Sequence, residues 1–400
     1  MNEQPATPVT QISPYAPWPY YEPDEVAAVT RALSSGKVNY WTGEEARAFE
    51  REYAAAAGTA HAIAVCNGTS ALELAIYALD IPPGSEIITT PRTFIASASC
   101  IVMRGCIPVL ADVDPVTQNI TAATIERVLT PRTRAIIPVH LAGWPADMDP
   151  IMDLAQRHGL KVIEDCAQAN GATYKGRPVG SLGHIAAFSF CQDKIITTGG
   201  EGGMVTTNDK ALWERAWSFK DHGKSWDAVY NRQHAPGFRW LHESFGTNWR
   251  MTELQAAIGR VQLTKLPEWT RIRRANLARL NALWSRFSCL RTTPTPPEIG
   301  HAAYKAYVFV RPENLREGWT RDRILAELAE RGVPSFSGSC SEIYLEKAFT
   351  SSPYGPFPTL PAARELGETS LMFQIHPNLT EANLRETEAA MAEVFAAASR

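Results

Sequence analysis

Cysteine is scarce in this chain and follows no recognisable spacing. Its 400 residues contain seven cysteines, an odd number, scattered without any CxxC pair. Such a distribution argues against a disulfide framework and against a cysteine-based metal site. It suits a reducing compartment. We therefore expect a cytoplasmic protein without disulfide bonds.

The sequence also lacks a long hydrophobic run and a strong excess of one charge. Its longest apolar stretches, such as residues 186–191, are far too short to cross a bilayer. The first residues have neither a basic start nor an apolar core, so no signal peptide is predicted. The formal net charge of −3 gives no reason to expect nucleic acid or an anionic membrane as a partner.

Metal-binding and nucleic-acid-binding patterns are missing as well. The nine histidines show no HxxxH spacing and no carboxylate-paired metal spacing, so no metal site is predicted. Basic residues do cluster at Arg271, Arg273 and Arg274, within an expected helix. In a slightly acidic protein such a cluster is more typical of a solvated helix face than of a nucleic-acid surface.

A regular alternation of short apolar segments with helical segments occupies the first two thirds of the chain. Strands are predicted at residues 61–66, 86–89, 107–113, 135–140, 161–165, 183–191 and 203–207. Helices are predicted at residues 23–35, 43–58, 70–79 and 94–103, and others begin near Thr121 and Met148. This alternation indicates an α/β fold with a mainly parallel central sheet covered by helices on both faces.

The last third of the sequence has a different pattern of predicted helices and strands. From Met251 the pattern is helical, with one helix expected at 251–263 and a second, basic helix from Pro267 to about residue 287. Beyond a proline-rich stretch, strands are predicted at 304–310 and 370–375, and helices at 320–331 and 380–399. This pattern is typical of a smaller α+β domain.

Length and pattern together predict two domains and an arm. Four hundred residues are too many for one small core. We expect an N-terminal arm at 1–22, a large cofactor-binding domain at 23–265 and a small C-terminal domain at 266–400.

The most informative residues are a lysine and an aspartate at the ends of two predicted strands. Lys194 lies between the strand at 183–191 and a glycine-rich turn, and Asp165 closes the strand at 161–165. A lysine in such a loop can hold a carbonyl cofactor as a Schiff base, and an aspartate can hold a pyridinium nitrogen protonated. These are the two groups that pyridoxal phosphate (PLP) chemistry needs most. Either residue alone would be read as an ordinary surface lysine or a structural acid.

A third feature lies at the same predicted edge of the sheet. Gly68 and Thr69 follow the strand at 61–66 and open a helix, an arrangement that presents backbone amides to a phosphate. Alone it would be read as a simple helix cap, and Phe94 alone as a core residue. Because ligands bind at the carboxyl ends of strands in open parallel sheets, the four features together favour one PLP site.

Six stretches of the chain match a known family in register. They are Asn67-Gly68-Thr69-Ser70-Ala71-Leu72, Pro91-Arg92-Thr93-Phe94-Ile95-Ala96-Ser97-Ala98, Val139-His140-Leu141-Ala142-Gly143, Glu164-Asp165-Cys166-Ala167-Gln168-Ala169, Gly199-Gly200-Glu201-Gly202-Gly203-Met204 and Gly246-Thr247-Asn248-Trp249-Arg250-Met251. On these residues the chain resembles the DegT/StrS family of PLP-dependent nucleotide-sugar aminotransferases, which have the fold-type I architecture of aspartate aminotransferase. The resemblance is dense from about Tyr40 to Leu266 and loose in the final third.

The resemblance implies a role for each matching residue. Lys194 would form the Schiff base and move the proton. Asp165 would pair with the pyridinium nitrogen. The implied cofactor contacts are Phe94 on the ring face, Gln168 at the phenolic oxygen, and Gly68, Thr69 and Ser189 at the phosphate. Asn248 would reach the phosphate of a neighbouring subunit, so two active sites would be shared across a homodimer.

The implied reaction is a ping-pong transfer of an amino group, with L-glutamate the expected donor and a keto sugar of a nucleotide-diphosphate sugar the acceptor. A keto-cyclitol aminotransferase, a PLP-dependent dehydratase of the same family and a non-catalytic PLP-fold sensor remain alternatives. One departure bears on the substrate. Residues 332–344 are rich in Ser, Gly and Cys where many relatives have a proline- and histidine-containing segment that helps to form the sugar pocket. The sequence leaves open the nucleotide, the sugar, the aminated carbon and the pathway.

Overall fold

The computed structural model describes residues 14–400. Its α-helices are α1 Pro23–Ser34, α2 Glu45–Ala57, α3 Gly68–Ala78, α4 Ala96–Met103, α5 Ala122–Glu126, α6 Met148–His158, α7 Lys210–Lys220, α8 Trp226–Tyr230, α9 Glu253–Trp284, α10 Arg321–Glu330, α11 Lys347–Thr350, α12 Pro361–Thr369 and α13 Glu381–Ala398. Its strands are β1 His61–Val65, β2 Glu86–Thr89, β3 Ile107–Leu110, β4 Thr133–Ile136, β5 Lys161–Asp165, β6 Thr173–Tyr174, β7 Arg177–Pro178, β8 Ile185–Ser189, β9 Gly203–Thr207, β10 Leu290–Arg291, β11 Ile299–Gly300, β12 Ala306–Val310, β13 Ser335–Phe336 and β14 Ser370–Phe373. Among these residues no helix is both long and apolar enough to span a membrane.

The central sheet has seven strands in the order β1-β9-β8-β5-β4-β2-β3. The pairs from β8 to β3 are parallel, and β9 is antiparallel to both of its neighbours. The prediction of a mainly parallel α/β sheet is therefore confirmed. Antiparallel β9 was not anticipated, because the apolar pattern of a buried strand does not reveal its direction.

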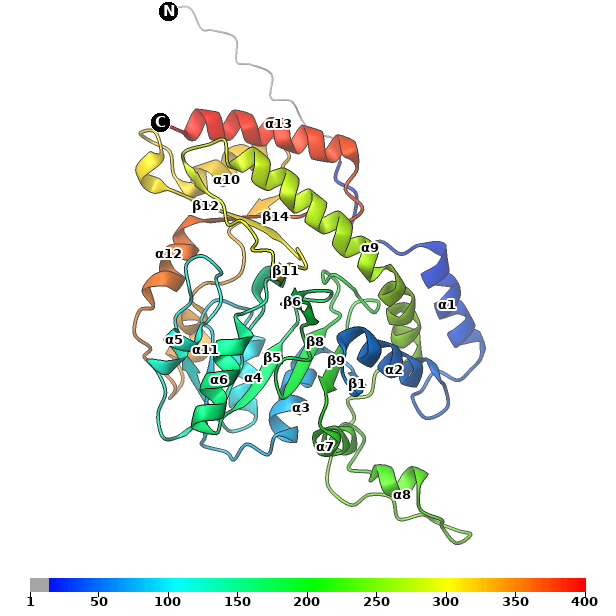
Figure 1. Cartoon of the computed structure of the whole chain (residues 1–400). Coiled ribbons are helices and arrows are strands. Elements are labelled where there is room, and N and C mark those ends of the chain that lie inside the picture. Colours follow the sequence, from blue (N-terminus) through cyan, green and yellow to red (C-terminus); the bar gives the residue numbers. More distant parts are fainter. Residues whose placement is uncertain (1–13) are drawn as a thin grey trace, which may run out of the picture.

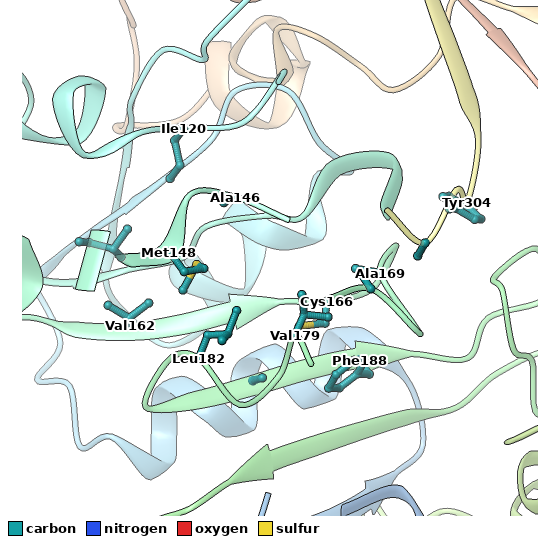
Figure 2. Packing of buried hydrophobic residues seen from close by; sticks show 14 of the residues in the cluster. Ile120, Ala146, Met148, Val162, Cys166, Ala169, Val179, Leu182, Phe188 and Tyr304 are labelled. Atoms are coloured by element: carbon teal, nitrogen blue, oxygen red, sulfur yellow. The ribbon is translucent and has the colours of Figure 1, made fainter. Parts of the chain in front are cut away.

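Each face of this sheet is covered by its own apolar layer (Figure 1). Successive residues of β5 separate to the two faces, since side chains alternate along a strand. Ile163 packs in a cluster with helices α3, α4 and α7, whereas Val162 packs in a cluster with α2 and α6. Figure 2 shows the second cluster, in which Val162 lies on β5, Cys166 directly follows that strand and Phe188 lies on β8. The sheet is thus held between two helical layers, and its strand ends are left for a site.

A second core lies in the C-terminal third. The sheet β10-β12-β14-β13 packs with α9, α10 and α13 around a cluster that includes Trp284, Val308 and Phe395. In a third, small sheet, β11 pairs with the β6–β7 hairpin. Because β6 and β7 lie in the chain between β5 and β8, this sheet links the C-terminal part to a connection of the large sheet. The short strands β6, β7, β11 and β13 were not predicted, because two residues carry no periodicity.

The helix α9 contradicts one prediction. Two helices were expected, at 251–263 and from Pro267, but α9 is continuous from Glu253 to Trp284 with Pro267 inside it. Proline removes one backbone hydrogen bond from a helix. Here the helix packs against α1 and α2 before the proline and contributes Leu277 and Trp284 to the C-terminal cluster after it. The expected domain boundary at 265–266 falls inside this helix, and the division into domains stays a prediction.

The prediction of a solvated basic face on the same helix is wrong for one residue, Arg273. Arg271 is exposed and pairs with Glu268, but Arg273 is only 1% exposed. Its Nη1 donates to the backbone oxygen of Tyr304 at 3.2 Å. Burial lowers the pKa of Arg273 to about 9. Arg273 lies on the face of α9 that meets the C-terminal part, which a local charge pattern does not show.

Candidate active site

A cavity of about 1000 Å³ opens at the carboxyl ends of the parallel strands. Seven of the eight predicted site residues line it: Gly68, Thr69, Phe94, Asp165, Gln168, Ser189 and Lys194. They come from four separate segments of the large sheet and its connections. The cavity therefore gathers residues that the sequence separates by more than a hundred positions.

Asp165 is the last residue of β5 and is 3% exposed. Its Oδ2 accepts a hydrogen bond from the Ser97 hydroxyl at 2.7 Å, and its Oδ1 accepts one from the Ala167 amide at 3.1 Å. Burial raises the pKa of this carboxyl, while the Ser97 and Ala167 bonds and the charge of Lys194 act against burial. A buried carboxylate held in this way is suited to face a cationic ring nitrogen.

Lys194 follows β8 in a short turn, where its amide donates to the Cys191 oxygen at 3.1 Å. Its Nζ lies 5.2 Å from the centroid of the Tyr304 ring. The Tyr304 hydroxyl donates to the carboxylate of Asp193. Burial opposes ionisation of Asp193, but Lys194, Tyr304 and Lys305 together hold its pKa below the usual value. The Lys194 amine is thus placed in the cavity beside an aromatic wall.

The N-terminus of α3 forms the other end of the cavity. Asn67 caps this helix by accepting from the Ser70 amide at 2.8 Å, so the cap is neither Thr69 nor Ser70. The Gly68 and Thr69 amides belong to the first turn, whose amides have no acceptor within the helix. A Cβ at Gly68 would lie 2.6 Å from the Ser189 Cβ, so glycine allows the helix start to approach that serine. Two backbone amides and one hydroxyl converge there, as an anion requires.

Phe94 and Gln168 complete the wall between these two ends. Phe94 is 69% exposed, an unusual exposure for a large aromatic side chain, and it lines the cavity. Gln168 is largely buried, and its Oε1 accepts from the Ala142 amide at 2.8 Å. Because that bond uses its oxygen, the amide nitrogen of Gln168 is left to donate.

These residues fit PLP. The cofactor has a phosphate, an aldehyde, a ring nitrogen and two ring faces. The α3 N-terminus with Ser189, the Lys194 amine, the buried Asp165 carboxylate and the Phe94 ring match them in that order. The arrangement is that of a PLP enzyme, and the comparisons with known proteins agree.

The sequence profile of the DegT/DnrJ/EryC1/StrS aminotransferase family matches residues 19–392. The chain belongs to this family. It is therefore a PLP-dependent aminotransferase with the fold of that family. Its crystallised relatives include an aminotransferase from Psychrobacter cryohalolentis, 56% identical, with a TM-score of 0.94 over 96% of this chain and 99% of the other.

Curated DegT-family relatives cover most of the chain too. GDP-perosamine synthase of Caulobacter vibrioides is 39% identical over 87% of this chain and 89% of its own length. A dTDP-3-amino-3,4,6-trideoxy-alpha-D-glucose transaminase of Streptomyces venezuelae is 35% identical over 88% of this chain and 90% of its own length.

Asn248 is the predicted residue that the structure does not bring into the cavity. It is exposed, and it is paired with Asp221 in an isolated bridge. Its neighbour Trp249 accepts from the Cys66 amide at 2.9 Å. Asn248 thus lies on the outer side of the strand end that precedes the phosphate cradle of its own chain, and its role stays a prediction.

Among the cavity residues of this DegT-family enzyme to which the sequence analysis gave no role are Ser97 and Lys305. Ser97 could have been given one, because it lies in a stretch that matches the family, three residues after Phe94 at the start of α4. Lys305 could not, because it precedes β12 in the part of the chain that resembles the family only loosely.

The N-terminal arm also contributes to the site. The predicted arm was 1–22, and residues 1–13 lie outside the described part. Trp18 donates from Nε1 to the backbone oxygen of Lys194 at 3.1 Å. Its ring stacks on His376 at 5.7 Å and meets Trp269 edge-on at 5.2 Å, and the Arg273 guanidinium lies 4.8 Å from it. The arm therefore supports the turn that carries Lys194.

Replacing Trp18 is expected to slow the enzyme. In Trp18→Phe the ring remains but the indole donor is lost, and a hydrogen bond of this kind is worth about 0.5–1.5 kcal/mol. We expect kcat to fall roughly two- to tenfold, and further in Trp18→Ala. The exposed Leu33 on α1 provides the control, because Leu33→Ala should leave kcat unchanged. Wild-type kcat in both Trp18 variants would contradict the supporting role.

Proposed function

We propose that this enzyme transfers an amino group from an amino acid, with L-glutamate as the first candidate, to a keto sugar carried on a nucleotide diphosphate, and that it works in the cytoplasm. The relatives' names support the acceptor class, since one is a GDP-sugar synthase and another a dTDP-sugar transaminase.

The observation that carries the proposal is the extent of the cavity. Beyond Lys194 and Phe94 it continues along Phe336 to Cys340 and along Met372 and Gln374, at β13 and β14 of the C-terminal sheet. Pockets for small ligands have volumes of about 300–1000 Å³. At about 1000 Å³ the cavity is at the upper end of that range and has room for a large second ligand beside the cofactor.

Some residues of the cavity serve to bind the cofactor, and Lys194 serves to transfer the proton. Bound PLP supplies a carbonyl for the amino group and a ring that takes up electrons from the substrate carbon. The α3 N-terminus with Ser189 would hold the phosphate, Phe94 would orient the ring, and Asp165 would keep the ring nitrogen cationic. The Lys194 Nζ would take the proton from the donor carbon and carry it until it is returned in the transfer. Positioned proton transfer contributes roughly 10²–10⁴-fold. The donor's keto acid leaves before the keto sugar binds.

A reverse-direction screen tests the substrate class. The enzyme is incubated with 2-oxoglutarate and a panel of nucleotide-linked amino sugars, and products are read by mass spectrometry. One or more panel members should yield glutamate and the matching keto sugar, and the Lys194→Ala variant should yield none.

With amino cyclitols added to the panel, the same screen separates the alternatives. Reaction of amino cyclitols but of no nucleotide sugar would indicate a cyclitol aminotransferase. Loss of water without amino transfer would indicate a dehydratase. Binding of PLP without any turnover would indicate a sensor, and each of these results would overturn the proposal.

We also propose that the chain forms a homodimer in which Asn248 reaches the cofactor phosphate of the partner subunit. The loop between α8 and Asn248 extends away from the body of the molecule (Figure 1). It carries Phe238, Trp240 and Phe245, which are 76%, 82% and 98% exposed. Exposed apolar patches of this kind mark interaction surfaces.

Mixing two defective variants tests the shared site. Asn248→Ala removes a hydrogen bond to an anion, worth roughly 1.5–3 kcal/mol, so PLP should bind about ten- to a hundredfold more weakly. At limiting PLP, Asn248→Ala and Lys194→Ala should each be nearly inactive. In a mixed dimer one site has both defects and the other has neither, so random exchange should restore about a quarter of all sites.

The exposed Asn208, directly after β9, provides a matched control, since Asn208→Ala should bind PLP like the wild type. If mixing restores nothing although subunit exchange is verified by mass, Asn248 does not complete the partner's site.

A further inference from the structure

Lys305 is a cation in the cavity wall that the proposed chemistry has not used. It precedes β12 and lines the cavity, with its side chain 16% exposed. Its Nζ lies 4.7 Å from the Tyr304 ring centroid, and Lys194 Nζ lies 5.2 Å from the same point. The two amines therefore flank one aromatic ring.

The charge around Lys305 is not balanced by a close partner. Its ion pair is with Asp193 Oδ2 at 3.7 Å, longer than the roughly 2.7–2.9 Å of a charge-assisted hydrogen bond. Asp193 also accepts from Tyr304 and interacts with Lys194, so its charge is shared. Burial lowers the pKa of Lys305, Asp193 acts against burial, and Arg273 and Lys194 lower that pKa further. Three cations thus surround one carboxylate.

Other carboxylates line the cavity but do not neutralise this group. Glu201 and Glu346 are in the wall, but among the described residues the ion pair of Lys305 is with Asp193 alone. An ammonium that is mostly removed from water and lacks a close partner binds an incoming anion well.

We propose that Lys305 is the binding residue for a substrate carboxylate, an inference that rests on the proposed aminotransfer. The α-carboxylate of an amino donor is attached to the carbon that carries the reacting amine. When that amine replaces the Lys194 amine, the carboxylate must lie close by, and the Lys305 amine lies beside the same Tyr304 ring as the Lys194 amine. A carboxylate on the sugar acceptor has the same chemistry and is the second source.

Equilibrium binding to the holoenzyme tests the site without turnover. The donor probe is glutarate, which has the carboxylates of glutamate but no amine, with the uncharged glutaramide as comparison. The sugar probes are UDP-glucuronate and UDP-glucose, which differ in one carboxylate. Calorimetry gives the dissociation constant of each probe in wild type, Lys305→Met and Lys305→Arg.

If the donor is the source, Lys305→Met should weaken glutarate binding roughly ten- to a hundredfold and leave glutaramide unchanged. The KM for L-glutamate should rise with it. Lys305→Arg, which keeps the cation, should remain within a few-fold of wild type. If the sugar is the source, Lys305→Met should instead weaken the binding of UDP-glucuronate and leave that of UDP-glucose unchanged.

Lys210→Met is the matched control, because Lys210 is an exposed lysine whose side chain is 73% exposed. It should change none of these constants. Unchanged binding of both carboxylate probes in Lys305→Met, with PLP content equal to wild type, would overturn the proposal. The outcome is distinct from a failure of the substrate screen, because glutarate binding requires no amino transfer.

Discussion

Lys194→Ala is expected to abolish amino transfer and still yield a folded protein that binds PLP without a covalent bond. The Lys194 side chain places its amine beside the Tyr304 ring. Removing this side chain leaves the α3 N-terminus, Ser189, Phe94 and Asp165 in place. Loss of the proton-transfer group alone costs roughly 10²–10⁴-fold, and loss of the covalent link adds to this. Turnover is measured with donor and acceptor in excess, and bound PLP is measured after gel filtration.

Borohydride reduction and peptide mapping locate the attachment point. The pyridoxyl label should appear on Lys194 in the wild type and on no lysine in Lys194→Ala. Lys220 is the rival with the most reactive environment, because it is fully buried and burial lowers its pKa to about 8. It lies over the Tyr40 ring, outside the residues that line the cavity. Label on Lys220 or Lys305 would refute the assignment of Lys194.

The features best predicted from the sequence are those that depend on consecutive residues. Asp165 and Lys194 could be found because Asp165 ends an apolar strand and Lys194 follows one, and strand ends of a parallel sheet meet at one edge. The strands at 86–89, 161–165 and 203–207 agree with β2, β5 and β9 because each is a short, continuous apolar run. The cradle at Gly68 was visible as a glycine opening a helix.

Features that depend on distant packing could not be predicted. The continuity of α9 through Pro267 depends on what packs on either side of the proline. The burial of Arg273 and the position of Trp18 depend on how the arm meets α9, since these two residues are separated along the chain. Lys305 became a cavity residue only through the placement of the C-terminal sheet. Each of these is a contact between segments that no local pattern connects.

Asp165→Asn is expected to keep the fold and the bound cofactor but to slow turnover strongly. Asparagine has the shape of aspartate, and its one amide oxygen can still accept either the Ser97 or the Ala167 hydrogen bond. Because burial already raises the pKa of this carboxyl, neutralising it should not lower the free energy of unfolding. The lost charge is the one that favours a protonated ring nitrogen. An opposite charge at contact distance shifts such an equilibrium roughly ten- to a thousandfold, so kcat should fall by that factor.

Ser97→Ala also tests the role of the Asp165 charge, with a smaller change than Asp165→Asn. It leaves the Asp165 charge but removes its 2.7 Å hydrogen bond, one of the interactions that oppose the pKa-raising effect of burial. The carboxylate should then be less readily ionised, and kcat should fall several-fold, less than in Asp165→Asn. The pH profile distinguishes the two variants, because raising the pH ionises Asp165 in Ser97→Ala and should recover activity, whereas asparagine cannot ionise. Near-normal turnover of Asp165→Asn with a full content of PLP would mean that another group controls the ring nitrogen.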